Sequence, residues 1–326
     1  MTIKAAILGF GTVGQGIYKI IQSKRQQLYK LLGDEVELES VLVNDIQKER
    51  ALPEKIVVTD RFEDILSQRP DVIFEATVGA EPSFSYLNQA IDQNIHIVTA
   101  NKVMFAARGH ELLQRASQNV GIGYEATTAA GIPIIGTLKT LLQTNQVTKV
   151  QGILNGTSNY ILTAMQEEDK SFSEALHEAQ VKGYAEADPT NDVEGHDAFY
   201  KLMILSQLLY SRQPVWSEVP LTGISHLGQK DLQAAKRRGE KIRHVASLEF
   251  VDGILKGRVE PLSLPSSHGL FSVEGVDNAI DVTGDLVGSV TLRGPGAGQI
   301  PTASAMIEDF VQIWQARSIR LQPSLL

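Results

Sequence analysis

Apolar residues in the first hundred positions fall into short runs separated by amphipathic segments. The runs predict strands at residues 3–8, 36–43, 71–75 and 95–98. Between the first two strands, apolar residues recur every three or four positions as far as Leu32. This spacing predicts one long helix that ends at Gly33. A second helix is predicted at residues 82–92. Alternating strands and helices are typical of an open parallel sheet with helices on both faces.

The pattern becomes less regular after a predicted helix at 112–117 and a predicted strand at 121–124. Residues 125–133 interrupt the alternation, and the chain then becomes richer in strands. Helices are predicted at 135–142, from Tyr160, from a capping box formed by Ser171 and Glu174, and at 303–314. Strands are predicted at 147–154, 245–251, 254–259, 270–273 and 279–282. The change of pattern places a domain boundary near residue 134.

A glycine-rich loop, GFGTVG, directly follows the first predicted strand and precedes the first helix. Gly9 allows a tight turn, Gly11 lets the backbone approach a pyrophosphate, and Gly14 lets helix and strand pack closely. The candidate cofactor contacts here are Gly9, Phe10, Gly11, Thr12, Val13 and Gly14. The fold expected is therefore α/β, with a Rossmann-type, doubly wound dinucleotide-binding domain at 1–134 and an α+β domain at 135–326. The C-terminal helix, at about 300–320, is expected to pack back near the first domain.

Asp45 follows the second predicted strand and is a candidate acceptor for the ribose hydroxyls of NAD. It lies further from the glycines than the usual spacing of about 20 residues, because the intervening helix is long. The alternative is that Asp45 is a turn residue at the end of a strand. Lys48 and Arg50, just beyond it, could receive the 2′-phosphate of NADP. The sequence leaves NAD and NADP both open.

Other polar residues follow later strands or a second glycine cluster. Thr77 and Lys102 come after predicted strands, where ligands bind in doubly wound sheets, although either could be an ordinary polar loop residue. The cluster GPGAG, at 294–298, could be a rigid loop or, with Gly298, a second backbone wall against the cofactor.

The stretch GYAEADPTNDVEGHDAFYKL, at 183–202, gathers several carboxylates before an apolar helix. Asp197 and Lys201 are four residues apart and so share one face of that helix. Their spacing alone would also fit an ordinary surface ion pair. The apolar run that follows Lys201 favours a lysine held beside carboxylates at the edge of a core.

The charge and the cysteine content of the chain exclude several kinds of partner and of chemistry. A formal net charge of -8 argues against nucleic acid or an anionic membrane as partner. The absence of cysteine excludes disulfides, thiolate metal sites and thiol nucleophiles, including a thioacyl route for an aldehyde dehydrogenase. With no signal peptide and no long apolar window expected, a cytoplasmic location is predicted.

Taken together, these motifs resemble the homoserine dehydrogenase family. The resemblance covers almost the whole chain in six segments: GFGTVG (9–14), TANK (99–102), EATTAAGIPII (125–135), GILNGTSNYIL (152–162), GYAEADPTNDVEGHDAFYKL (183–202) and GPGAGQIPTASA (294–305). It implies NAD(P)-linked interconversion of L-aspartate 4-semialdehyde and L-homoserine, on the route to threonine and methionine.

The resemblance also assigns roles to residues. Lys201 would be the acid/base group, Asp197 the residue that orients it, and Lys102 a second lysine facing cofactor and substrate. The residues implied for the substrate are Glu186, Asp192, Thr157 and Gly183. A monovalent cation similar to sodium would be held, mainly through main-chain carbonyls, by Glu125, Thr128, Ala130 and Ile132. The family further implies a homodimer formed through the second domain.

Two departures from the family pattern bear on cofactor and regulation. Asn44 stands where many relatives have an Arg suited to a 2′-phosphate, which weakens an NADP assignment. Only residues 315–326 follow the last core helix, so a C-terminal ACT regulatory domain that senses threonine is expected to be absent. The alternatives to this enzyme are a dehydrogenase for another small aldehyde or imine, and a dinucleotide sensor without chemistry. Lys102 and Lys201 both argue against the sensor.

Overall fold

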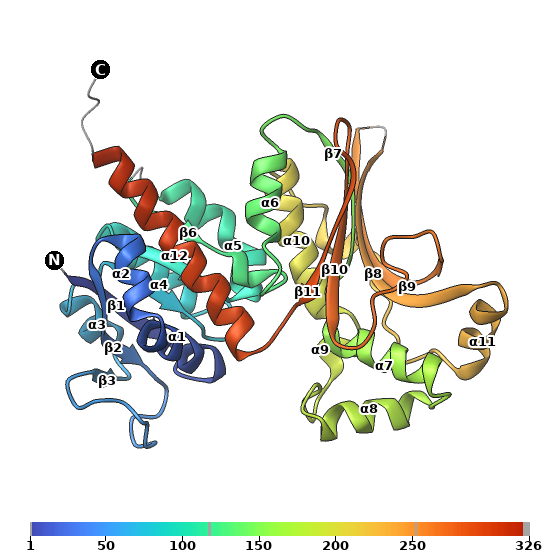
Figure 1. Ribbon diagram of the computed structural model, residues 1–326, viewed down its shortest axis with the longest axis horizontal. Helices are drawn as coiled ribbons and strands as arrows, with labels where there is room; N and C mark the ends of the chain where they lie inside the picture. The colour runs from blue at the N-terminus through green and yellow to red at the C-terminus, as the bar shows by residue number, and fades with distance from the viewer. Residues whose placement is uncertain (1, 117–118, 252, 322–326) are drawn as a thin grey trace. The chain divides into compact units, whose positions relative to one another are not determined.

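The computed structural model describes residues 2–116, 119–251 and 253–321, and the chain divides into two compact units (Figure 1). One unit comprises residues 1–130 and 298–326, and the other comprises residues 131–297. The predicted boundary after 134 thus lies four residues beyond the first of the two crossings between units. The helix expected to pack near the first domain belongs to the first unit.

The first unit is built on a six-stranded parallel sheet in the order β3-β2-β1-β4-β5-β6. Its strands are β1 (Thr2–Leu8), β2 (Glu35–Leu42), β3 (Val57–Thr59), β4 (Val72–Glu75), β5 (His96–Thr99) and β6 (Ile122–Gly123). Its helices are α1 (Thr12–Ser23), α2 (Arg25–Leu32), α3 (Phe62–Ser67), α4 (Ser83–Asp92), α5 (Lys102–Arg115), the 3-10 helix η1 (Glu125–Thr127) and α12 (Gln299–Leu321). The strand order reverses direction between β1 and β4, where doubly wound sheets bind their ligands.

Helix α12 completes the core of the first unit from the far end of the chain. Its apolar residues Ala303, Met306 and Phe310 are buried together with residues of β1, α1 and β2. Phe310 meets Phe74 of β4 edge to face, with the ring centroids 5.6 Å apart. The first unit therefore depends on a helix that is separated from it in sequence by the whole second unit.

The second unit is built on a five-stranded antiparallel sheet in the order β11-β10-β7-β8-β9. Its strands are β7 (Val147–Ile153), β8 (Glu240–Val251), β9 (Ile254–Pro265), β10 (Asp277–Gly284) and β11 (Gly288–Pro295). Its helices are α6 (Ile134–Leu141), α7 (Gly156–Glu167), α8 (Phe172–Val181), α9 (Thr190–Val193), α10 (His196–Tyr210), the 3-10 helix η2 (Trp216–Glu218) and α11 (Gln229–Arg237). The predicted fold class, a doubly wound α/β domain followed by an α+β domain, is confirmed.

Several predicted elements need correction. The single long helix before Gly33 is two helices, divided at Lys24, although Gly33 is a left-handed C-cap as predicted. Residues 270–273 do not form a strand: residues 270–272 are in turns, and only Leu270 and Val273 of the four are buried. Strand β11 was not predicted. It lies at the edge of its sheet, begins at a glycine and contains the Gly294 and Pro295 that the sequence had suggested were loop.

Candidate functional site

The glycine loop between β1 and α1 has two distinct steric requirements. Gly9 has a left-handed backbone, with φ of 88°, and a Cβ there would lie 2.7 Å from the carbonyl oxygen of Ala76. At Gly14 a Cβ would lie 2.2 Å from the carbonyl oxygen of Gly9, so the helix can approach the strand only without a side chain. The loop can therefore hold this shape only with glycine at both positions.

Gly11 differs from these two because the space around it is open. It is the N-cap of α1, and a Cβ built on it would meet no atom within 4 Å. The first N–H groups of a helix have no acceptor within the helix and favour an anion. The N-terminus of α1 therefore has both the room and the donors for a pyrophosphate, and the residues present fit a dinucleotide.

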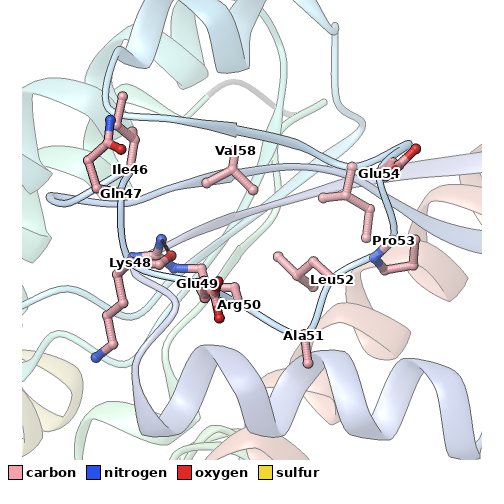
Figure 2. Close-up of a pocket in the computed structure, with 11 residues that line it drawn as sticks. Ile46, Gln47, Lys48, Glu49, Arg50, Ala51, Leu52, Pro53, Glu54 and Val58 are labelled. Atoms are coloured by element: carbon pink, nitrogen blue, oxygen red, sulfur yellow. Dashed lines mark hydrogen bonds between the residues drawn. The ribbon is translucent and has the colours of Figure 1, made fainter.

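The loop that follows β2 encloses an open pocket of about 700 Å³ (Figure 2). At its start the Asp45 carboxylate accepts the main-chain N–H of Gln47 at 2.9 Å, as in an Asx turn. Arg50 donates to the carbonyl oxygen of Lys48 at 2.7 Å, while Lys48 is exposed. Figure 2 shows the loop curving around Val58, with the Lys48 side chain extending away from it. Asp45 thus acts as a turn residue here. Its carboxylate lies within five positions of the cationic side chains of Lys48 and Arg50 in the sequence.

The ends of β4 and β5 are joined by a buried carboxylate. Glu75 accepts the Thr99 hydroxyl at 2.6 Å, the Thr77 main-chain N–H at 2.9 Å and the Asn101 amide at 3.3 Å. Asn101 in turn caps α5 by accepting the N–H of Met104. Lys102 is the first residue of α5 and is half-buried. The network fixes the loop that carries Thr77, and the start of α5 with Lys102, at the carboxyl edge of the sheet.

The second unit places Lys201 and Asp197 on α10 as a buried ion pair. Lys201 is 7% exposed and Asp197 4% exposed, and Nζ lies 2.8 Å from Oδ2. Nζ also donates to the carbonyl oxygen of Leu154, at the end of β7, at 2.6 Å. The ordinary surface pair that the spacing alone allowed is therefore wrong.

Asn155 is a member of this cluster that the sequence did not single out. Its amide nitrogen donates to Asp197 Oδ2 at 2.9 Å and to Asp192 Oδ1 at 2.7 Å. Its oxygen accepts the N–H of Ser158 at 2.8 Å and so caps α7. An Asn followed by a helix was the available signal, since asparagine is a favoured N-cap. The two carboxylates it contacts are 37 and 42 residues away, beyond the reach of spacing arguments.

The other residues implied for the substrate surround the loop before α9. The Thr157 hydroxyl donates to the carbonyl oxygen of Tyr184 at 2.6 Å, which ties the start of α7 to the residue after Gly183. Gly183 has a left-handed backbone, with φ of 75°, immediately after the C-cap of α8. Glu186 is exposed in the loop between α8 and α9, and Asp192 lies in α9. Asp192, Asp197 and Lys201 therefore belong to one cluster, which is joined through Asn155. Glu186 is exposed to solvent in the loop.

The remaining candidates flank the crossings between units. Glu125, Thr128, Ala130 and Ile132 are all buried, and Ala130 has an unusual positive φ of 42°. Burial raises the pKa of the neighbouring Tyr124 hydroxyl, and the charges of Asp309 and Glu125 add to this. Gly298, with φ of 118°, directly precedes α12. In the described ranges, no group of three or more His, Cys, Asp or Glu side chains is arranged to hold a metal ion. Such a group is a different kind of site from a ring of main-chain carbonyls.

Two family models match the chain. Residues 9–124 match "Homoserine dehydrogenase, NAD binding domain" and residues 133–311 match "Homoserine dehydrogenase". The chain belongs to the homoserine dehydrogenase family. It is therefore an NAD(P)-dependent oxidoreductase.

Individual homoserine dehydrogenases agree with this assignment. The enzyme of Bacillus subtilis (strain 168) is 40% identical over 95% of the chain and 72% of its own length. The NAD(+)-dependent homoserine dehydrogenase of Pseudomonas canavaninivorans is 34% identical over 99% of both chains. The crystal structure of the Thiobacillus denitrificans homoserine dehydrogenase superposes with a TM-score of 0.92, at 34% identity, over 99% of the chain and 76% of that protein. Across the described part of the chain, no helix is both long and apolar enough to span a membrane.

Proposed function

We propose that this homoserine dehydrogenase interconverts L-homoserine and L-aspartate 4-semialdehyde with Lys201 as the general acid/base. The observation that carries this proposal is the buried ammonium group of Lys201, held by Asp197 and by the carbonyl oxygen of Leu154. Reduction of an aldehyde creates an alkoxide that needs a proton, and oxidation of the alcohol releases one. A lysine fixed by two acceptors can give or take that proton from a defined direction.

The nicotinamide cofactor, when bound, supplies or accepts the hydride. This chain's own residues would bind and orient the reactants. Glu186 and Asp192 would attract the substrate ammonium group, and Thr157 and Gly183 would shape the adjoining wall. Lys102, at the start of α5, would face both cofactor and substrate.

We assign cofactor binding to the first unit. The N-terminus of α1 would hold the pyrophosphate, and its contacts would be Gly9, Phe10, Gly11, Thr12, Val13 and Gly14. Thr77 and Gly298 would extend this surface. Asp45 would accept the ribose hydroxyls of NAD after leaving its Asx turn, whereas Lys48 and Arg50 offer charge for the 2′-phosphate of NADP. The second unit would bind the substrate and carry the chemistry.

The first experiment is the oxidation of L-homoserine by purified protein, followed through the absorbance of reduced nicotinamide, with NAD and NADP in parallel. Lys201→Ala should lower kcat by at least about a hundredfold while nucleotide binding is retained. Asp45→Ala should weaken NAD far more than NADP. A wild-type protein that binds nucleotide but does not oxidise homoserine would refute the proposed reaction, and equal losses for both nucleotides would refute the role of Asp45.

Three further assignments accompany the reaction. The first is a monovalent cation bound mainly by the carbonyls of Glu125, Thr128, Ala130 and Ile132, tested by titrating sodium into cation-depleted enzyme. The second is a homodimer, tested by light scattering. The third is a role in threonine and methionine synthesis, tested by restoring growth without these amino acids to a strain that lacks the enzyme.

A further inference from the structure

Asn155 lies where β7 ends and α7 begins, and it bonds to both Asp192 and Asp197 of the candidate active site. The residue is 6% exposed. The residue before it, Leu154, supplies the carbonyl that holds Lys201. Two consecutive residues of one turn therefore hold the two members of the ion pair, with Leu154 on the ammonium and Asn155 on the carboxylate.

The three bonds of Asn155 fix the orientation of its amide. The oxygen caps α7 through the N–H of Ser158, and both hydrogens of the nitrogen are directed to carboxylates, one on α9 and one on α10. A flipped amide would place its oxygen against both carboxylates and its nitrogen against a donor. Aspartate or serine could provide the cap but could not donate to both carboxylates. Only the asparagine side chain supplies all three bonds.

Through Asp197, the bonds of Asn155 affect the orientation of Lys201. The same oxygen, Asp197 Oδ2, receives Nζ of Lys201 at 2.8 Å and the Asn155 amide at 2.9 Å. The amide thus prevents the carboxylate from rotating around the lysine. An ammonium group has three N–H bonds, and fixing two of them at Asp197 and Leu154 fixes the direction of the third.

We propose that Asn155 is a positioning residue for the reaction: it fixes Asp197, and so the direction in which Lys201 transfers its proton, and links this pair to Asp192. The inference rests on the proposed function, in which Lys201 is the acid/base group and Asp192 binds the substrate ammonium. Because the amide is neutral, its nitrogen can donate to both carboxylates without adding a third negative charge beside them.

The test uses two variants that keep the helix cap. Serine and aspartate are both good N-caps. Asn155→Ser leaves one O–H on a shorter side chain in place of the two amide donors, and Asn155→Asp replaces them with a negative charge. Each should lower kcat for homoserine oxidation roughly 10- to 100-fold, as small misplacements of catalytic groups do, with unchanged NAD affinity. In Asn155→Asp the pH midpoint of the rate should also move to higher pH. The added charge, beside Asp192 and Asp197, would favour protonated Lys201.

Ser171→Asp is the matched control because it exchanges a cap and adds the same charge at α8 of the same unit, away from the cluster. It should leave kcat and the pH midpoint unchanged. A loss of folded enzyme that is the same at every pH lowers the rate without moving the pH midpoint. Circular dichroism at each pH of the assay shows whether the folded fraction of an Asn155 variant is constant.

Two failures are distinguishable. Wild-type rates and an unshifted midpoint in both Asn155 variants, with Lys201→Ala inactive, would overturn the positioning role alone and leave Asn155 as a helix cap. Full activity of Lys201→Ala, or no homoserine oxidation by the wild-type protein, would overturn the proposed function and this inference with it.

Discussion

Gly11 and Gly14 belong to the same turn but differ in what surrounds their α-carbons. A Cβ at Gly14 would lie 2.2 Å from a carbonyl oxygen, whereas a Cβ at Gly11 would meet only open space. Gly14→Ala should therefore lower the free energy of unfolding by about 1–3 kcal/mol. Gly11→Ala should unfold like the wild type but bind NAD at least roughly tenfold more weakly, a loss of about 1.4 kcal/mol. Thermal unfolding and a fluorescence titration with NAD measure the two effects. Wild-type NAD affinity in Gly11→Ala would mean that the pyrophosphate does not lie there.

His244 makes the stability of the second unit depend on pH. Its Nε2 lies 3.0 Å from the carbonyl oxygen of Thr222, so Nε2 carries the hydrogen, and the buried Nδ1 has no hydrogen-bond partner among the described residues. Burial lowers the pKa of His244 to about 4, against opposing contributions from the Thr222 bond and the charge of Glu194. Protonation of His244 in acid would therefore put an N–H on the buried Nδ1, and no acceptor in the described part of the chain is bonded to that nitrogen.

The direction of the pH effect follows from that lowered pKa. The unfolded chain takes up a proton at His244 below about pH 6.5, and the folded chain does so only near pH 4. Stability is thus complete above pH 6.5 and falls as the pH drops towards 4, by about 3 kcal/mol in all at about 1.4 kcal/mol per pH unit. Urea unfolding at several pH values should show a smaller loss in His244→Gln than in the wild type. The exposed His226→Gln is the control, and equal slopes in all three proteins would contradict the assignment.

At the level of elements, the start of α7 shows why sequence patterns placed some boundaries wrongly. The helix was predicted from Tyr160, because Gly156, Thr157, Ser158 and Asn159 are weak helix formers. Tertiary bonds override that preference. The Asn159 amide donates to the carbonyls of Val273, Gly275 and Asp277, more than a hundred residues away. One of these bonds holds the main chain at Val273, the end of the segment that was predicted as a strand and in which Leu270 and Val273 are buried.

The crossing of α1 and α12 allows a test at the same scale. Alanine in place of a helical glycine normally adds about 1 kcal/mol of stability. At Gly16, however, the new Cβ would lie 2.7 Å from the carbonyl oxygen of Gln299 and 3.0 Å from the Cβ of Ala303. Gly16→Ala should therefore lower the unfolding midpoint, whereas Gln22→Ala, on the exposed side of α1, should change it little. A higher midpoint in Gly16→Ala would show that the two helices can separate at no cost.

For the whole molecule, the sequence predicted most where the information is local. The alternation of strands and helices around GFGTVG predicted the doubly wound sheet. The four-residue spacing of Asp197 and Lys201 put the two side chains on one helix face, and the apolar run after Lys201 was also needed to favour a pair at the edge of a core. Long-range contacts were not accessible to such patterns. Lys19 donates to Gln299 at 3.1 Å across 280 positions, and Asn155, just after β7, donates to Asp192 and Asp197, which are 37 and 42 residues away. The edge strand β11 was missed because its glycine-flanked, largely exposed sequence lacks a buried face.

The division of candidate residues between the two units leads to a prediction for the whole chain. All proposed cofactor contacts lie in the first unit, and all proposed substrate contacts except Lys102 lie in the second. Hydrogen exchange should therefore slow mainly at residues 9–14 and 75–79 with NAD, and at 155–158 and 183–197 with homoserine. A ligand at a hundred times its Kd stabilises its site by about 2.7 kcal/mol, which is roughly a hundredfold slowing of exchange by global opening. At the same NAD concentration Gly11→Ala should show an NAD effect at least about tenfold smaller, because its Kd is at least about tenfold higher, and should keep the homoserine effect. The contrary result is that NAD slows exchange at residues 155–158 of the second unit and still does so in Gly11→Ala. The cofactor would then bind elsewhere, and the roles of the two units would have to be reassigned.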